Sequence, residues 1–144
     1  MKKNNGLSFF IPKKETGLDA ILINTGISAG FPSPAGDYKQ ERISLDKELI
    51  KNQEATFFAR VSGESMVNAG LEDGDLIIID RSIEPANNKI AVCYIDGEFT
   101  VKRLRVKKGK IWLQPENSKY QAIEIKDDNE LIIWGIVTNV VKKL

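Results

Sequence analysis

The stretch KIAVCYIDGEFTVKRLRV (residues 89–106) decides the fold of this chain. Two runs rich in β-branched and aromatic residues flank Asp96-Gly97, a dipeptide that favours the tight turn of a β-hairpin. Further segments of similar composition, separated by turn-forming residues, cover 56–62, 75–80, 110–114, 121–125 and 131–142. Many short strands joined by tight turns predict a mostly β fold, either a small, largely antiparallel sheet or a partly open barrel.

The N-terminal part of the chain has a different composition. Residues 1–18 are polar and contain Gly and Pro, which predicts a loose, flexible arm, and residues 19–24 could form one short strand. The segment 25–37 is dense in Gly, Ser and Pro, which excludes a helix, and Pro32 and Pro34 favour an extended path. We therefore expect a linker here.

A short helix is predicted between this linker and the β-rich region. The pattern covers residues 45–51, with Ser44 as the N-cap residue. Its apolar positions are expected to face inward; they are Leu45, Leu49 and Ile50. Beyond this helix, the sequence from residue 55 onward reads as β structure.

Composition indicates one soluble, globular domain. The chain has 144 residues, 42% hydrophobic and 28% charged, and a net charge of +1 that predicts no broad nucleic-acid surface. No stretch approaches the length of a membrane span, and the apolar run 7–11 ends too early at Pro12 for a signal peptide. We expect a cytoplasmic protein.

Two residue types are informative by their scarcity. The chain contains no histidine, which rules out a Ser-His-Asp triad, a Cys-His dyad and any His-ligated metal site. Its single cysteine, Cys93, can form neither an internal disulfide nor a multi-Cys zinc site, which fits a reducing compartment. Because Cys93 lies in an apolar run, we expect a buried core residue. The sequence predicts no cofactor and no metal.

Ser65 lies where a strand gives way to a helical turn. Gly63-Glu64-Ser65-Met66 follows the predicted strand, and the next residues form a short helical pattern closed by Gly70. Backbone N–H groups at such a start are unpaired and could stabilise an oxyanion. Ser65 could equally be an ordinary N-cap residue, and the tetrapeptide alone does not exclude that.

Lys102 is the most conspicuous candidate base for a serine in a chain without histidine. It lies in the middle of the predicted strand 98–106, where alternation places it on the same face as Thr100 and Leu104. In a sheltered cleft, desolvation would lower the pKa of Lys102 and leave a neutral amine able to accept the serine proton. Taken alone, the strand fits a surface lysine better.

The linker contains a pair of small residues, Ala29-Gly30. A bond that a nucleophile attacks needs an extended backbone and little side-chain bulk on either side, and this pair meets both conditions. In isolation it could also be part of an ordinary linker.

Several blocks, in their order and spacing, resemble the C-terminal domain of the LexA/UmuD family of self-cleaving Ser–Lys peptidases, and the UmuD-like branch most closely. The resemblance covers residues 25–144. The blocks are Ala29-Gly30-Phe31-Pro32-Ser33-Pro34-Ala35, Ser62-Gly63-Glu64-Ser65-Met66, Gly70-Leu71-Glu72-Asp73-Gly74-Asp75-Leu76, Asp96-Gly97-Glu98-Phe99-Thr100-Val101-Lys102 and Gly135-Ile136-Val137. UmuD-like proteins often have Cys before the scissile Gly, and here Ala29 takes that position, as in LexA-like repressors.

The resemblance implies a set of roles. Ser65 is the nucleophile, Lys102 the general base and Ala29–Gly30 the scissile bond, so that residues 1–29 form an arm removed from a peptidase domain of residues 30–144. The backbone N–H groups of Glu64 and Ser65 are the implied oxyanion donors. To these we add Thr100, which could hydrogen-bond the Lys102 amine and orient it.

The resemblance also implies a function in the SOS response to DNA damage. A UmuD-like member is a homodimeric accessory subunit of an error-prone Y-family DNA polymerase, and a RecA filament on single-stranded DNA promotes its self-cleavage. Only 29 residues precede the expected cut, fewer than a helix-turn-helix domain needs, so we expect no sequence-specific DNA binding. The alternatives are a LexA-like transcriptional regulator, a signal peptidase and a binding module with an inactive site.

Overall fold

The computed structural model describes residues 7–13, 20–23, 29–30 and 40–144. It divides the chain into two units. The first, which we call the body, comprises Met1–Pro12 and Asn52–Leu144, and the second, the hairpin unit, comprises Lys13–Lys51. The hairpin unit contains β2 (Ala20–Ile23), which pairs antiparallel with β3 (Gln40–Ile43), followed by α1 (Leu45–Leu49).

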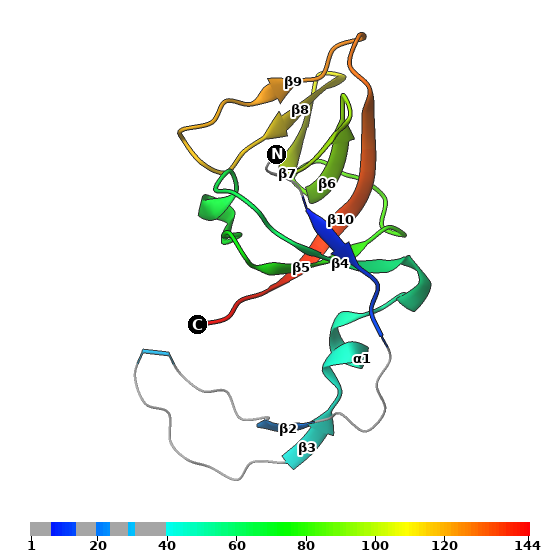
Figure 1. The fold of residues 1–144 in the computed structure, drawn as a ribbon, viewed down its shortest axis with the longest axis vertical. Helices are drawn as coiled ribbons and strands as arrows, with labels where there is room; N and C mark the ends of the chain where they lie inside the picture. The colour runs from blue at the N-terminus through cyan, green and yellow to red at the C-terminus, as the bar shows by residue number, and fades with distance from the viewer. Residues whose placement is uncertain (1–6, 14–19, 24–28, 31–39) are drawn as a thin grey trace, which may run out of the picture. The chain divides into compact units, whose positions relative to one another are not determined.

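An eight-stranded sheet forms the body (Figure 1). Its strands are β1 (Ser8–Phe10), β4 (Thr56–Arg60), β5 (Leu76–Asp80), β6 (Ile90–Ile95), β7 (Glu98–Lys107), β8 (Lys110–Gln114), β9 (Ile123–Glu124) and β10 (Leu131–Val141). They follow the order β1-β4-β5-β10-β6-β7-β8-β9, and every neighbouring pair is antiparallel. The predicted mostly β, largely antiparallel fold is confirmed.

The turn at Asp96-Gly97 joins β6 to β7 as the sequence predicts. Both residues have positive φ angles, 47° and 90°, and the flanking residues Ile95 and Glu98 face each other across the hairpin. Positive φ at both central positions is the geometry that suits a two-residue turn between twisted strands. This hairpin places the middle of β7 in the interior of the body.

The sheet curls back on itself. β1 and β7 are well separated in the strand order, yet the rings of Phe9 and Phe99 lie 5.0 Å apart. Figure 1 shows β10 running through the whole body and bending on the way. One register shift of β10 falls between Ile133 and Gly135, where a Cβ atom at position 135 would come within 2.5 Å of Ile79 Cγ2. Glycine therefore permits the close approach at this bend.

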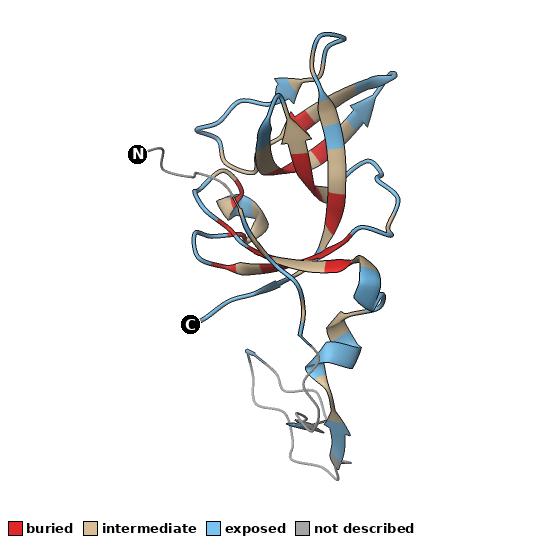
Figure 2. Cartoon of the chain, turned by 45° about the vertical axis from the view of Figure 1, so that its right-hand side comes forward, coloured by how far each residue is buried: buried red, intermediate tan, exposed pale blue. Residues whose placement is uncertain are grey.

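Two clusters of buried residues fill the body. Figure 2 marks the buried positions in red on the strands. One cluster comprises Ala59, Val61, Met66, Leu71, Ile77, Ile79, Val92 and Val101. The other comprises Ala91, Cys93, Leu104, Leu113 and Ile136. Cys93 is fully buried, which confirms the prediction of a core residue.

Strand β1 falls within the segment for which the sequence predicts a loose arm. Ser8–Phe10 pairs with β4, while residues 1–6 and 14–18 lie outside the described residues. Three residues carry too short a pattern to indicate a strand. What holds them is packing of Phe9 against aromatic rings from distant parts of the chain.

The helical prediction is partly wrong. Helix α1 has Ser44 at its N-cap position, but the Ser44 side chain makes no capping hydrogen bond. Leu45 was expected to face inward and is 64% exposed, whereas Leu49 and Ile50 are half-buried. A helix of five residues is too short to present all three apolar side chains on one face. Most of the predicted linker, residues 25–28 and 31–37, lies outside the described residues.

Candidate active site

Ser65 lies in the segment between β4 and β5, at a sharp change of direction. Gly63 has a φ of +95°, a conformation that favours glycine, and the chain then enters the 3-10 helix η2 (Val67–Ala69). Gly70, with a φ of +82°, ends that turn, as the sequence predicts. The Ser65 side chain is half-buried and lines a cavity.

Lys102, from the middle of β7, meets Ser65 inside the body. Its side chain is only 8% exposed, and its Nζ lies 3.1 Å from Ser65 Oγ. The same Nζ lies 2.5 Å from Thr100 Oγ1 and 3.1 Å from the carbonyl oxygen of Val101. Thr100 and Lys102 share a face of β7, as strand alternation predicts. The structure thus brings three of the predicted site residues together.

Burial sets the protonation chemistry of this cluster. It lowers the pKa of Lys102, because an ammonium group loses solvation in the interior. It also raises the pKa of the neighbouring Cys93 thiol to about 12, so the thiol stays neutral near pH 7 and offers the lysine no counter-charge. A neutral Lys102 amine has two N–H groups, which suit Thr100 Oγ1 and the Val101 carbonyl, and a lone pair for the Ser65 hydroxyl.

Two side chains brace the Ser65 loop, Asp73 from the same connection between β4 and β5 and Asn117 from the connection between β8 and β9. The backbone N–H of Gly63 donates to Asp73 Oδ1 at 2.9 Å, and Asn117 Nδ2 donates to the carbonyl oxygen of Glu64 at 2.8 Å. That carbonyl belongs to the same planar peptide unit as the Ser65 N–H, so Asn117 fixes the direction of this N–H. Sequence reasoning missed both Asp73 and Asn117 as site residues. Each lies in a turn-like segment, which gave no signal of such a role.

The backbone N–H groups of Glu64 and Ser65 stay the predicted oxyanion donors. Within the part of the chain that the structure describes, neither donates to a protein acceptor. The helix that follows has only three residues, so any stabilisation of an oxyanion would come from these individual donors rather than from a helix dipole.

The cavity beside Ser65 is small, about 30 Å³, which is little more than the space of a water molecule. Its walls include Leu7, Val61, Ser62, Met66, Phe99, Thr100 and Val101. Leu7, which precedes β1, is one of these walls.

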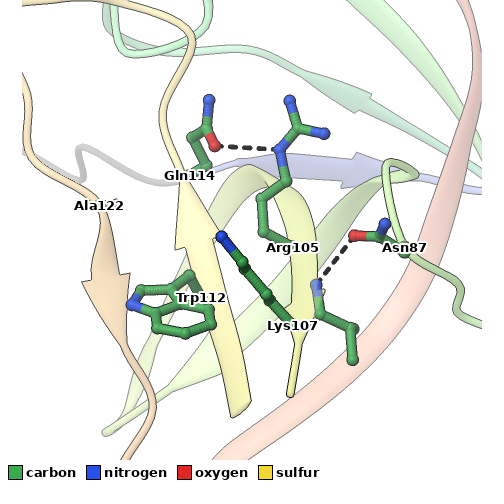
Figure 3. A pocket seen from close by; sticks show the side chains of 7 residues that line it. Asn87, Arg105, Lys107, Trp112, Gln114 and Ala122 are labelled. Atoms are coloured by element: carbon green, nitrogen blue, oxygen red, sulfur yellow. Dashed lines mark hydrogen bonds between the residues drawn. The ribbon is translucent and has the colours of Figure 1, made fainter. Parts of the chain in front are cut away.

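A larger hollow, of about 410 Å³, lies elsewhere on the body (Figure 3). It is lined by Asn87, Arg105, Val106, Lys107, Trp112, Gln114 and Ala122, and contains neither Ser65 nor Lys102. Its polar groups are partly occupied by one another, because Arg105 Nε donates to Gln114 Oε1 and the Val106 N–H donates to Asn87 Oδ1. We assign no part in the Ser65–Lys102 site to this hollow.

Ala29 and Gly30 are exposed and belong to the hairpin unit. Their part in a cleavage reaction stays a prediction. Among the described residues, no group of three or more Cys, Asp or Glu side chains gathers as a metal site would. No helix in the described ranges has the length and apolar character needed to cross a membrane.

The chain matches the Peptidase S24-like family over residues 21–138, which is most of its length. It therefore belongs to the Peptidase S24-like family, the class of protein that the fold and the Ser–Lys cluster suggest. The match establishes the family and leaves the roles of individual residues open.

Individual relatives place the chain in the UmuD-like branch. It is 44% identical to Protein SamA of Salmonella typhimurium over 124 residues, 86% of each chain, and 42% identical to Protein MucA of the same species over 114 residues, 78% of this chain and 77% of MucA. It is 39% identical to the LexA repressor of Frankia alni over 82% of this chain, but that match spans 45% of the repressor. The resemblance to the LexA/UmuD family, closest to its UmuD-like branch, is confirmed.

Proposed function

We propose that this chain is a serine peptidase that cleaves its own Ala29–Gly30 bond with Ser65 as nucleophile and Lys102 as general base. The observation that carries the proposal is the buried Lys102 amine, 3.1 Å from the Ser65 hydroxyl. Membership of the Peptidase S24-like family supports the reaction class. The domain division follows from the cut: residues 1–29 leave, and residues 30–144 remain.

The reaction has two stages. Neutral Lys102 accepts the Ser65 proton as Oγ attacks the Ala29 carbonyl carbon, and the N–H groups of Glu64 and Ser65 stabilise the oxyanion. Protonated Lys102 then returns the proton to the departing Gly30 nitrogen, which leaves an ester between Ala29 and Ser65. Water, deprotonated by Lys102, attacks that ester, and Ser65 regains its proton. Thr100 holds the amine in line throughout.

Cleavage leaves a fragment of 144 − 29 = 115 residues that begins at Gly30. We expect it after incubation near pH 10, where more of the Lys102 amine is neutral, and after incubation with RecA filaments on single-stranded DNA. Intact-mass measurement detects the cut and locates it. If the mass of the chain stays unchanged under both conditions, the proposed reaction is wrong.

Asn117 is expected to act as a positioning residue for the oxyanion donor. Replacing Asn117 by Ala removes the hydrogen bond to Glu64 and lets the Ser65 peptide unit rotate, so cleavage should slow by about tenfold, the smaller effect expected of a group that acts through a donor. A cleavage time course checks this. The pH at which the rate levels off should not move, because Lys102 is untouched. A rate equal to that of the unaltered chain would remove Asn117 from the site.

We infer that the cleaved chain serves in the SOS response as the accessory subunit of an error-prone, UmuC-like Y-family polymerase in the cytoplasm. The relatives SamA and MucA support this, because each matches across most of both chains. A RecA filament favours the cleavable state and performs no chemistry. The match to a LexA repressor favours a transcriptional regulator as the second candidate. Binding to a preferred operator with steep salt dependence would select that candidate.

The chain is also expected to form a homodimer, as its family does. Part of β10 offers an apolar surface, since Ile132 and Val141 are 58% and 45% exposed. Sedimentation at micromolar concentration should give about twice the chain mass of 16.1 kDa. A mass of one chain across the micromolar range would argue against the dimer.

A further inference from the structure

Strand β1 occupies an edge of the body's sheet. It pairs with β4 so that Phe9 lies opposite Ala59, while the other side of β4 pairs with β5 (Figure 1). Without β1, therefore, β4 would be the edge strand. An uncovered edge presents a row of unpaired N–H and C=O groups and readily accepts another extended segment.

Beside this edge lies an aromatic socket, which we define as Phe57, Phe99 and Trp134. The Phe9 ring enters it, with its centroid 4.8 Å from that of Trp134 and 5.0 Å from that of Phe99. The rings of Phe57 and Trp134 are 5.0 Å apart, so the socket is one connected cluster. The three socket rings come from β4, β7 and β10, and the ring that fills the socket comes from β1.

The pattern of β1 shows what the socket selects. Leu7 and Phe9 pack against the core cluster, whereas Ser8 and Phe10 between and after them face outward. A matching ligand is thus an extended segment with an aliphatic residue and, two positions later, an aromatic residue on the same face. Phe10, 48% exposed, adds little to the fit and serves as a matched control for Phe9.

The pairing of β1 with β4 depends on the covalent link between β1 and the rest of the chain, which we call its tether. Only three residues pair with β4, and such a short strand stays in place chiefly because the chain keeps its local concentration high. Residues 1–29 include β1, so the proposed cut between Ala29 and Gly30 removes that tether. This step rests on the proposed function. After the cut, β1 can diffuse away and leave the edge and the socket uncovered.

We propose that the β4 edge and the aromatic socket form a strand-binding site, filled by β1 in the intact chain and by an extended segment of a partner protein after the cut. The partner segment carries the aliphatic–x–aromatic pattern of Leu7-Ser8-Phe9. Main-chain hydrogen bonds along β4 hold it, and the ring in the socket provides the specificity. The same exchange removes Leu7 from the wall of the Ser65 cavity.

The test uses the full chain with Ser65→Ala, so that none of it is cut, and Trp112→Phe, so that Trp134 is the single tryptophan. The probe is a synthetic peptide with the sequence of residues 7–12, LSFFIP, added to chains that also carry Phe9→Ala or Phe10→Ala. The indole N–H resonance of Trp134 reports binding. We expect the peptide to bind the Phe9→Ala chain at least about tenfold more tightly than the parent, in which β1 competes.

Matched controls decide the outcome. The Phe10→Ala chain should behave like the parent, and a peptide with Ala in place of Phe9 should lose at least about tenfold in affinity. Equal binding of the two peptides, or no change at Trp134 up to millimolar peptide in the Phe9→Ala chain, overturns the strand-binding site.

The same probe tests release after the cut. With Ser65 intact, the product of alkaline incubation should bind the peptide as the Phe9→Ala chain does. If the cut occurs and the product does not bind, β1 stays in place and the partner exchange is wrong. If the cut does not occur, the proposed function fails. The strand-binding site is still tested in that case, because peptide binding to the uncut Ser65→Ala chains does not depend on cleavage.

Discussion

We expect that replacing either Ser65 by Ala or Lys102 by Met slows self-cleavage by at least about 10³-fold. The first change removes the attacking oxygen. The second removes the amine that lies 3.1 Å from that oxygen and leaves a side chain of similar length. Because the two groups act as one unit, the double variant should be no slower than either single variant. The rate is followed as the loss of full-length chain in mass spectra.

Controls separate chemistry from folding. Lys107→Ala changes an exposed lysine at the end of the same strand as Lys102, so this chain should cleave at the unaltered rate. Lys102→Arg should not cleave, because a guanidinium group does not deprotonate in proteins. Cleavage by the Lys102→Met chain at the unaltered rate would mean that another base serves Ser65.

Most strands of the body could be predicted from the sequence because their pattern is local. β-branched and aromatic runs bounded by turn residues mark β4 to β10, and Asp96-Gly97 fixes the β6–β7 hairpin. Two strands escaped prediction, β1 and β3 (Gln40–Ile43). Of these, β1 depends on rings from β7 and β10. No local pattern encodes contacts with residues so far along the chain. The outward Leu45 likewise reflects a helix too short to be governed by its own periodicity.

In the site, too, local patterns could be predicted from the sequence, whereas contacts between distant residues could not. Residue types and spacing pointed to Ser65 and Lys102 as candidates, but only the resemblance to a family joined them, since they stand 37 positions apart. The placement of Thr100 beside Lys102 followed from strand alternation. Asn117 could not be found in this way, because its role depends on a hydrogen bond to the carbonyl oxygen of Glu64, 53 positions away, in a different loop.

The cleavage rate is expected to rise about tenfold for each pH unit and then to level off below pH 10.5, the ordinary pKa of lysine. The rise follows from the fraction of Lys102 that is neutral, and burial lowers the pKa that sets this fraction. If an exposed lysine were the base, the cleavage rate would level off only near or above pH 10.5. A rate that still climbs tenfold per unit above that pH would show that the buried amine is not the base.

Folding stability offers an independent measure of the same pKa. Between the lowered pKa of Lys102 in the folded chain and 10.5 in the unfolded chain, Lys102 takes up one proton on unfolding, so its contribution to the free energy of unfolding rises with pH through this window. Below the window both states are protonated and the full cost of the buried charge is present. We expect urea unfolding to show this slope for Ser65→Ala and not for Ser65→Ala with Lys102→Met. Both chains also carry Cys93→Ala, because the Cys93 thiol, whose pKa burial raises to about 12, would add an opposite slope that depends on Lys102. Equal slopes in the two chains would mean that Lys102 titrates as it does in water, and a cleavage plateau in the same pH window would then need another source.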